Sequence, residues 1–199
     1  MDVALIDSGG ANIGSVKYAL ERLGVRAELT ADAERIAGAD RVILPGVGAA
    51  GAGMARLREL ALVEVVRGLT QPLLGICLGM QLLFDASEEA GTACLGVIPG
   101  TVRRLATGDG IRVPHMGWNA LKTLRADPLL DGIDANGQAY FVHGYAAPVS
   151  EDTLATSTHG SEFAAVVRRG NRWGAQFHPE RSASVGARLL ENFLSERLA

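Results

Sequence analysis

The sequence has few cysteines and no excess of charge of either sign. Its 199 residues include two cysteines, Cys77 and Cys94. Nineteen lysines and arginines nearly balance 22 aspartates and glutamates, so the formal net charge is −3. A chain so close to neutral lacks the basic surface with which proteins bind nucleic acids or anionic membranes. We therefore expect neither of these partners.

The sequence also lacks the patterns of metal sites, signal peptides and membrane spans. Its four histidines lie far apart, and no CxxC or HxxxH spacing occurs. The N-terminal segment MDVALIDSGG has an acidic second residue and only four apolar residues in a row, too few for a signal peptide or a transmembrane helix. We expect a cytoplasmic protein without cofactor or metal, whose cysteines stay reduced.

The order of segments predicts one α/β domain that spans residues 1–199. The length suffices for one sizeable core, and no linker rich in proline, serine or charge divides the chain. In the first half, strand-like and helix-like segments alternate, which predicts an open, mainly parallel sheet with helices on both faces. The expected strands are 3–7, 25–30, 41–46 and 72–76, and the expected helices are 13–23, 33–37 and one long helix within 52–69.

The second half of the chain consists of shorter strand-like runs. A Gly170-Asn171 turn within the run 162–177 indicates a hairpin, and hence antiparallel additions to the sheet. The other runs are 96–105, 117–124, 138–145 and 153–158. A final helix at about 183–198 should pack on the sheet, because its apolar residues share one side. These residues are Leu189, Leu190, Phe193, Leu194 and Leu198.

The segment PLLGICLGMQLLF (72–84) places Cys77 between two glycines. Simple packing is one explanation, since free cysteine behaves as a small hydrophobic residue. A strand that ends at a cysteine and leads directly into a helix also has the pattern of a nucleophile elbow. That sharp turn requires small residues two positions before and after the nucleophile, and Gly75 and Gly79 stand there. The start of the helix would favour the thiolate over the thiol.

The segment QFHPERS (176–182) offers a base and a group that could orient it, His178 and Glu180. Pro179 disfavours helix at His178, and alternate residues of an extended segment point the same way, so the two side chains can share a face. Alone, the segment would be interpreted more simply as a polar strand end. Both segments, however, end strands of the expected sheet, and such sheets bind ligands outside the carboxyl ends of their strands.

Taken together, GICLGMQLLF and GAQFHPE resemble the triad-type class I glutamine amidotransferases, and PGVGA (45–49) is similar to the loop that shapes their oxyanion hole. The segments 112–119 (RVPHMGWN), 140–145 (YFVHGY) and 96–105 (GVIPGTVRRL) resemble the glutaminase subunits of imidazole glycerol phosphate synthase, an enzyme of histidine biosynthesis. The resemblance runs from residue 2 to the final helix and implies a flavodoxin-like fold. Gly144 stands where serine is common in the family, and Arg181 where lysine is common.

The resemblance implies a glutaminase with a Cys-His-Glu triad. Cys77 would attack the side-chain amide carbon of glutamine, His178 would protonate the departing ammonia and then activate water, and Glu180 would hold the imidazole. Family geometry places the oxyanion-hole donors at the backbone N–H groups of Val47 and Leu78. The implied substrate-binding residues are Gly46, Gly48, Gln81, Gly144 and Tyr145.

The resemblance also implies a partner that uses the ammonia. We expect no synthase domain on this chain, so the acceptor would be the cyclase, a (β/α)₈-barrel subunit that forms a heterodimer with it and makes imidazole glycerol phosphate and an aminoimidazole carboxamide ribotide. Contacts with the cyclase are expected at Asn12, Tyr140 and Arg181. The alternatives are the glutaminase subunit of another amidotransferase such as anthranilate synthase, a non-catalytic regulatory subunit, or a cysteine hydrolase of peptides. No chemical role is assigned to His115, Trp118, His143, His159 or Cys94.

Overall fold

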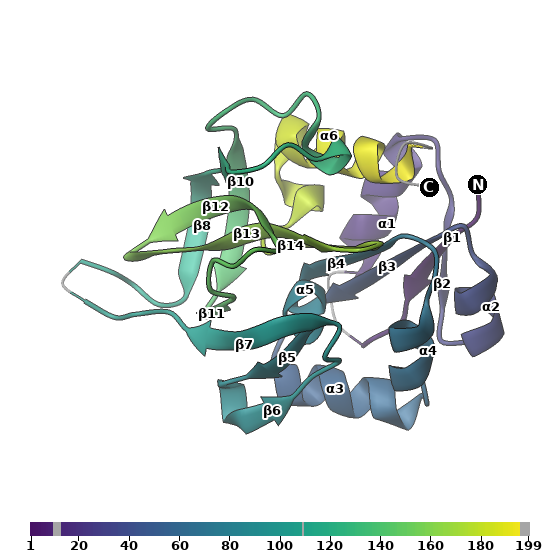
Figure 1. Cartoon of the computed structure of the whole chain (residues 1–199). Helices are drawn as coiled ribbons and strands as arrows, with labels where there is room; N and C mark the ends of the chain where they lie inside the picture. The colour runs from purple at the N-terminus through teal and green to yellow at the C-terminus, as the bar shows by residue number, and fades with distance from the viewer. Residues whose placement is uncertain (10–12, 109, 196–199) are drawn as a thin grey trace.

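The computed structural model describes residues 1–9, 13–108 and 110–195, and an eight-stranded sheet runs through its centre (Figure 1). The first five strands in the sheet order are parallel, and the last three are added antiparallel. This arrangement confirms the mainly parallel sheet with antiparallel additions. The order is β2 (Ala27–Thr30), β1 (Val3–Ile6), β3 (Arg41–Gly46), β4 (Leu73–Cys77), β14 (Arg172–Ala175), β13 (Ser161–Arg169), β12 (Thr153–His159) and β9 (Lys122–Thr123).

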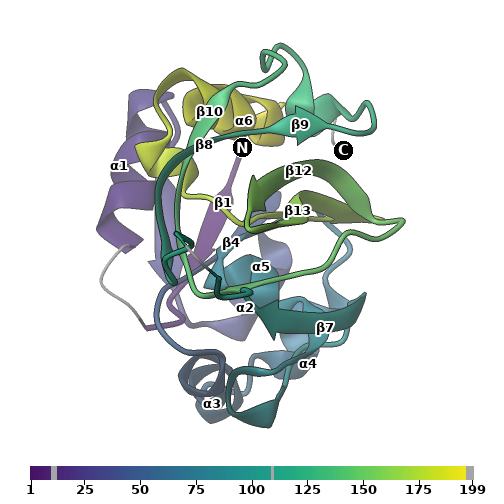
Figure 2. The ribbon, with the colours of Figure 1, turned by 90° about the vertical axis from the view of Figure 1, so that its left-hand side faces the viewer.

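Helices cover both faces of this sheet (Figures 1 and 2). One face carries α1 (Ile13–Arg22) and α6 (Ala183–Leu194), and the other carries α2 (Ala33–Gly38), α3 (Ala50–Glu59) and α4 (Val63–Gly68). Strand β1 is buried on both sides, with Val3 and Leu5 in the core beneath α1 and α6, and Ala4 and Ile6 in the opposite core. This alternation follows from the two-residue period of a strand.

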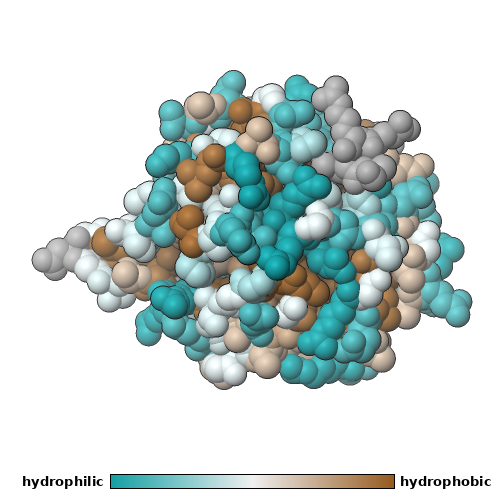
Figure 3. Space-filling view, viewed as in Figure 1, coloured by the Kyte–Doolittle hydropathy of each residue, from teal (hydrophilic) through white to brown (hydrophobic). Residues whose placement is uncertain are grey.

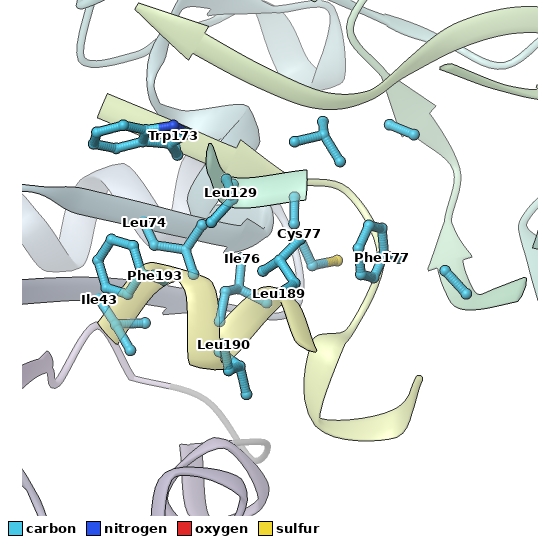
Figure 4. Packing of buried hydrophobic residues seen from close by; sticks show 14 of the residues in the cluster. Ile43, Leu74, Ile76, Cys77, Leu129, Trp173, Phe177, Leu189, Leu190 and Phe193 are labelled. Carbon is cyan, nitrogen blue, oxygen red and sulfur yellow. The ribbon is translucent and has the colours of Figure 1, made fainter. Parts of the chain in front are cut away.

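The final helix packs on the sheet as its apolar side predicts. Leu189 and Phe193 are fully buried and point toward Leu74 and Ile76 of β4 (Figure 4). Cys77 belongs to the same cluster and lies at its edge, on the side of Phe177. The helix ends at Leu194, and Leu198, which was expected on its apolar side, lies outside the described residues.

The expectation of one long helix within 52–69 is wrong, because two helices, α3 and α4, occupy this segment. Helix α3 ends in a Schellman-type turn, in which the N–H of Leu62 donates to the carbonyl of Leu57 at 2.8 Å and the N–H of Ala61 donates to that of Arg58 at 3.0 Å. Ala61 adopts the left-handed conformation that this turn needs, with φ of 55°. Because an alanine takes the place that glycine usually occupies, the sequence carries no signal for the break.

The expectation that the strand-like runs extend the central sheet is only partly correct. Several of them form two smaller sheets, one of β10 (Gln138–His143) and β8 (His115–Ala120), the other of β11 (Tyr145–Ala146), β7 (Ile98–Arg104), β5 (Phe84–Ser87) and β6 (Thr92–Ala93). Strand β5 begins early because α5 (Leu78–Leu82) has only five residues, after which Phe84 pairs with Ile98. Short 3₁₀ turns occur at η1 (Glu89–Gly91), η2 (Pro128–Leu130) and η3 (Pro179–Arg181).

On the face that Figure 3 shows, hydrophobic residues form several small, separate areas rather than one broad patch. Two of the most exposed large hydrophobic residues, Met116 and Trp118, lie on β8, where their side chains are 65% and 53% exposed. Within the described ranges, no helix combines the length and the apolar composition that crossing a membrane requires.

Candidate active site

Cys77 occupies a strained turn between β4 and α5. Its φ of 53° and ψ of −111° lie outside the regions that residues with side chains normally adopt, as at a nucleophile elbow. A Cβ on Gly75 would lie 2.7 Å from the backbone oxygen of Gly79, and one on Gly79 would lie 1.8 Å from the carbonyl oxygen of Leu44. The two glycines are therefore required by close backbone contacts, as the sequence predicts.

The neighbouring strands bring other site residues to the same edge of the sheet. In the register of the parallel strands, Gly46 of β3 lies opposite Cys77 on one side, and Ala175 of β14 lies opposite Ile76 on the other. The loop 45–49, which the resemblance predicts to shape an oxyanion hole, and the segment 176–182 thus continue from strands that flank the cysteine. The helix that follows Cys77 has only five residues, so it offers the N–H groups of a single turn rather than the dipole of a long helix.

His178 and Glu180 form a buried pair beside Cys77. Nδ1 of His178 lies 2.8 Å from Oε1 of Glu180, and the two side chains are 7% and 0% exposed. Burial alone lowers the pKa of His178, but hydrogen bonds to Cys77 and Glu180 and the negative charges of these groups outweigh it and raise the pKa to about 10. The pairing was expected from an extended segment, yet the 3₁₀ turn η3 follows His178 and brings the carboxylate back to the imidazole.

The backbone of His178 is fixed by its neighbours. Its N–H donates to the carbonyl of Tyr140 at 2.9 Å, and its own carbonyl accepts a hydrogen bond from Oγ of Ser182 at 2.7 Å. Ser182 is fully buried, and its hydroxyl also accepts from the N–H of Tyr140 at 2.9 Å. A Cβ on Gly186 of α6 would lie 1.8 Å from the carbonyl oxygen of Pro179, so this helix packs directly under the turn.

A cavity of about 280 Å³ opens beside the sulfur of Cys77. It brings together most of the residues that the sequence predicts for the site: Val47, Gly48, Cys77, Leu78, Gln81, Gly144, Tyr145 and His178. Gly46 does not line this cavity and instead lines a recess of about 10 Å³ that also touches Val47 and His178. Glu180 stands behind His178 and acts on the cavity only through it.

Three further lining residues were not expected from the sequence: Glu89, Val142 and His143. Glu89 belongs to η1, and its Oε2 accepts a hydrogen bond from the N–H of Ala50, the first residue of α3, at 2.6 Å. Nothing in the sequence indicates that the chain returns to the cavity there. Gln176, whose Nε2 lies 3.8 Å from Sγ of Cys77, was also missed. Its position two residues before His178, and hence on the same side of an extended segment, could have revealed it.

Two of the histidines without an assigned role, His115 and His143, are buried, and their pKa values are lowered. Burial lowers the pKa of His143 to about 3, although a hydrogen bond with the carbonyl of Tyr145 partly offsets the effect. Burial and the nearby His159 lower the pKa of His115 to about 4. Nδ1 of His115 lies 3.1 Å from Nε2 of His143, so the two rings share a hydrogen bond. In the described part of the chain, no group of three His, Cys, Asp or Glu side chains is placed to hold a metal ion.

The residues expected at the partner interface have different surroundings. The ring of Tyr140 packs edge-on against that of Trp118, with centroids 5.9 Å apart. Arg181 is exposed at the end of η3. Asn12 lies outside the described residues. Tyr140 and Arg181 therefore occupy the surface around the His178 segment, while their contact with a partner stays a prediction.

The strained turn at Cys77, the cavity beside its sulfur and the mainly parallel sheet fit the class of enzyme that sequence comparison identifies. Residues 4–196 match the family model "Glutamine amidotransferase class-I", so the chain belongs to that family. A crystal structure of a glutamine amidotransferase with 25% sequence identity superimposes with a TM-score of 0.76 and covers 100% of this chain and 98% of its own. PurLQS from Thermotoga maritima, 19% identical, has the same fold, with a TM-score of 0.70 over 97% of this chain and 97% of its own.

Relatives with higher sequence identity belong to one group within this family. The imidazole glycerol phosphate synthase subunit HisH of Xanthomonas euvesicatoria pv. vesicatoria is 63% identical over 193 residues, which cover 97% of this chain and 96% of the relative. The subunit HisH of Xylella fastidiosa (strain Temecula1) is 58% identical over the same shares of the two chains. The resemblance seen in the sequence motifs is thereby confirmed at the level of the family.

Proposed function

We propose that this protein is the glutaminase subunit of imidazole glycerol phosphate synthase and that it supplies ammonia for histidine biosynthesis in the cytoplasm, acting as one domain. The observation that carries the proposal is that Cys77 and His178 line one cavity on the carboxyl edge of the sheet, with Glu180 hydrogen-bonded to His178 behind it. The names of relatives that are 58–63% identical along nearly the whole chain support this assignment.

The first half of the reaction uses His178 as an acid. Because the pKa of His178 is raised to about 10, the imidazole is protonated at neutral pH and Cys77 attacks as a thiolate. The sulfur forms a bond to the side-chain amide carbon of glutamine, and the carbonyl electron pair moves to oxygen. When this intermediate collapses, the carbon–nitrogen bond breaks and His178 gives its proton to the leaving nitrogen. The products are ammonia and a glutamyl thioester on Cys77.

The second half uses the same imidazole as a base. Neutral His178 takes a proton from water, and the hydroxide adds to the thioester carbon. As the second tetrahedral intermediate collapses, the carbon–sulfur bond breaks, its electron pair returns to sulfur, and glutamate leaves. The imidazolium and the thiolate are then restored. Throughout the cycle Glu180 holds Nδ1 of His178, so that Nε2 faces the reacting atoms.

Two backbone N–H groups are proposed as the oxyanion hole. Leu78 begins α5 directly after the nucleophile, and Val47 follows strand β3, which pairs with β4 at Cys77. Both residues line the cavity. Losing one such donor typically reduces a rate about a hundred- to a thousandfold, so a rotation of the peptide at Val47 would suffice to switch the enzyme between inactive and active states. We propose that docking of the cyclase favours the active arrangement.

The far side of the cavity offers groups for the amino acid end of glutamine. Gln81, Gly48 and the backbone at Gly144 and Tyr145 line it, as the sequence predicts. Glu89 adds a negative charge to this lining, and we propose that its carboxylate pairs with the α-ammonium group of the substrate. An acidic side chain there would favour free glutamine over a glutamine residue within a peptide, which carries no such ammonium.

The proposed partner is the cyclase, a (β/α)₈-barrel subunit that binds this chain as a heterodimer and receives the ammonia. Free ammonia in neutral water becomes ammonium, which is not a nucleophile, so direct transfer favours a partner at the mouth of the cavity. Tyr140 and Arg181 lie next to His178, which lines the cavity, and the exposed Trp118 packs against Tyr140. A wide aromatic side chain left exposed beside Tyr140 suits a protein interface.

The test is synthesis of imidazole glycerol phosphate by the chain together with the cyclase of the same organism, with either glutamine or an ammonium salt as nitrogen source. We expect both sources to support synthesis by the wild-type complex. In the Cys77→Ala complex, glutamine should fail while ammonium still works. If glutamine supports no synthesis with this cyclase but does with the synthase subunit of another amidotransferase, the assignment is wrong.

A further inference from the structure

Gln176 is a buried polar residue next to the nucleophile. It follows the last residue of β14, and because Ala175 of that strand pairs with Ile76 of β4, Gln176 lies beside Cys77 in the register of the sheet. Its side chain is fully buried, and its backbone N–H donates to the carbonyl of Ala165 at 2.9 Å. A buried side-chain amide must have its hydrogen bonds within the protein, since no water reaches it.

The hydrogen bonds around Gln176 fix which end of its amide faces the sulfur. Nε2 of Gln81 lies 2.8 Å from the carbonyl oxygen of Tyr145, and a carbonyl can only accept, so the donor end of Gln81 faces it. The same nitrogen lies 2.9 Å from Oε1 of Gln176. The atom of Gln176 that faces this nitrogen must therefore be its amide oxygen, because it accepts the hydrogen bond. The amide nitrogen of Gln176 then lies on the side of Cys77, 3.8 Å from Sγ.

We propose that Gln176 is a further catalytic residue, whose amide N–H donates a hydrogen bond to the sulfur anion of Cys77. The inference rests on the proposed function, because it assigns a role in the same thiol chemistry. The carbonyl of Val142, also 3.8 Å from Sγ, can only accept a hydrogen bond and thus favours the thiol. The amide of Gln176 favours the anion, as hydrogen bonds to a charged form do.

None of the charged groups described near the sulfur of Cys77 donates a hydrogen bond to the thiolate throughout the reaction, whereas a neutral donor can. His178 hydrogen-bonds to Cys77, but it gives up its proton to ammonia during the reaction, so its support for the anion is lost at that stage. Glu180 stands behind His178, and Glu89 lines the same cavity; as carboxylates, both disfavour a second negative charge. The amide of Gln176 does not change its protonation, so it can serve the thiolate both before attack and when the carbon–sulfur bond breaks.

Alkylation of Cys77 by iodoacetamide as a function of pH tests this role without glutamine. Every protein carries Cys94→Ala, so that all labelling reports Cys77. In Gln176→Met, which keeps the bulk of the side chain and loses the donor, the pH of half-maximal alkylation rate should rise by about one to two units, the size expected for one hydrogen bond to a charged group. The maximal rate at high pH should stay unchanged, because both proteins are then thiolates.

A second variant and a control keep the result interpretable. Gln176→Glu preserves the shape of the side chain, so it protects the test against misfolding of the methionine variant, and its added charge should raise the half-maximal pH further. Gln71→Met makes the same change at a glutamine whose Nε2 donates to the carbonyls of Ile36 and Ala37, away from the cavity, and should leave the profile unchanged.

Two results would overturn the proposal. One is a half-maximal pH that does not move in folded variants. The other is a lower maximal rate with an unmoved half-maximal pH, which would show that Gln176 only shapes access to the sulfur. Failure of the proposed function is a separate outcome, because it would appear as a wild-type complex that does not hydrolyse glutamine.

Discussion

Replacing Glu180 by glutamine tests the electrostatic basis of the triad. The substitution keeps the shape of the side chain but removes the charge from a 2.8 Å contact between side chains that are 7% and 0% exposed. A hydrogen bond to a charged group contributes about 1.5–3 kcal/mol, which corresponds to about a 10- to 150-fold loss of kcat. The loss can reach about ten-thousandfold if the imidazole also adopts the wrong tautomer, as in the equivalent change in serine proteases.

The assay is steady-state glutamate release by the complex with the cyclase and its ligand. We expect kcat to fall within this range and KM for glutamine to change little, because Glu180 does not line the cavity. His178→Ala should be worse, since it removes the acid and the base. A Glu180→Gln complex with a kcat within twofold of the wild type would refute the assigned role.

The titration of His178 gives an independent measurement of the same contact. Its pKa of about 10 lies above the ordinary 6.5, so the pair stabilises the fold fully below about pH 6.5, and the stabilisation is lost as pH rises toward 10. In Glu180→Gln the pKa of His178 should fall, because burial still disfavours the charged imidazolium while the negative charge that offset this effect has been removed. NMR of the imidazole signals measures the change, and an unmoved titration would show that the Glu180 carboxylate does not hold the proton on His178.

Three further predictions concern the elbow, the oxyanion loop and the substrate end of the cavity. In Gly79→Ala the new Cβ would lie 1.8 Å from the oxygen of Leu44, so the free energy of unfolding, measured by urea titration, should fall by more than about 2 kcal/mol. In the control Gly14→Ala, in helix α1, the new Cβ would meet no neighbouring segment within 4 Å, so the free energy of unfolding should rise by about 0.5–1 kcal/mol. Gly48→Val should reduce the stimulation of glutamate release by the cyclase from about a hundredfold to about tenfold or less, since φ of 94° strains a β-branched residue; an unchanged ratio contradicts the gating. Glu89→Gln should raise KM for glutamine about tenfold while kcat stays within a few-fold, and a KM equal to that of the wild type would exclude the ammonium contact.

The parts of the fold that were predicted correctly are those governed by local patterns. Strand β3 occupies the expected residues 41–46, and the Gly170-Asn171 turn joins β13 to β14 as expected. The break at Ala61 was missed because it depends on packing of the flanking leucines, the buried Leu62 and the partly buried Leu60, which overrides the poor preference of alanine for the left-handed conformation. Pairing across long distances, as in the separate β8 and β10 sheet, has no signature in either segment alone.

The residues of the site also divide into those that a local sequence pattern predicts and those that only the folded chain brings together. Cys77, with the small residues around it, was evident because the turn restricts the sequence on both sides. Glu89 reaches the cavity only because the chain turns back after the short helix α5, so no local pattern marks it. Gly46 was expected to bind substrate, but a Cβ there would lie 3.0 Å from the backbone nitrogen of Gly79 and from Cβ of Leu78. The absence of a side chain at Gly46 therefore allows β3 to pack closely against the turn at Cys77.

The central claim is that Cys77 forms a covalent bond with the side-chain carbon of glutamine, and mass spectrometry of the labelled complex tests it most directly. The complex is incubated with a glutamine analogue that carries an electrophilic carbon at the amide position, digested, and mapped. We expect one adduct, on Cys77 and not on Cys94, formed in parallel with the loss of glutamate release. Full loss of activity without an adduct on Cys77, or undiminished glutamate release by Cys77→Ala, would contradict the claim.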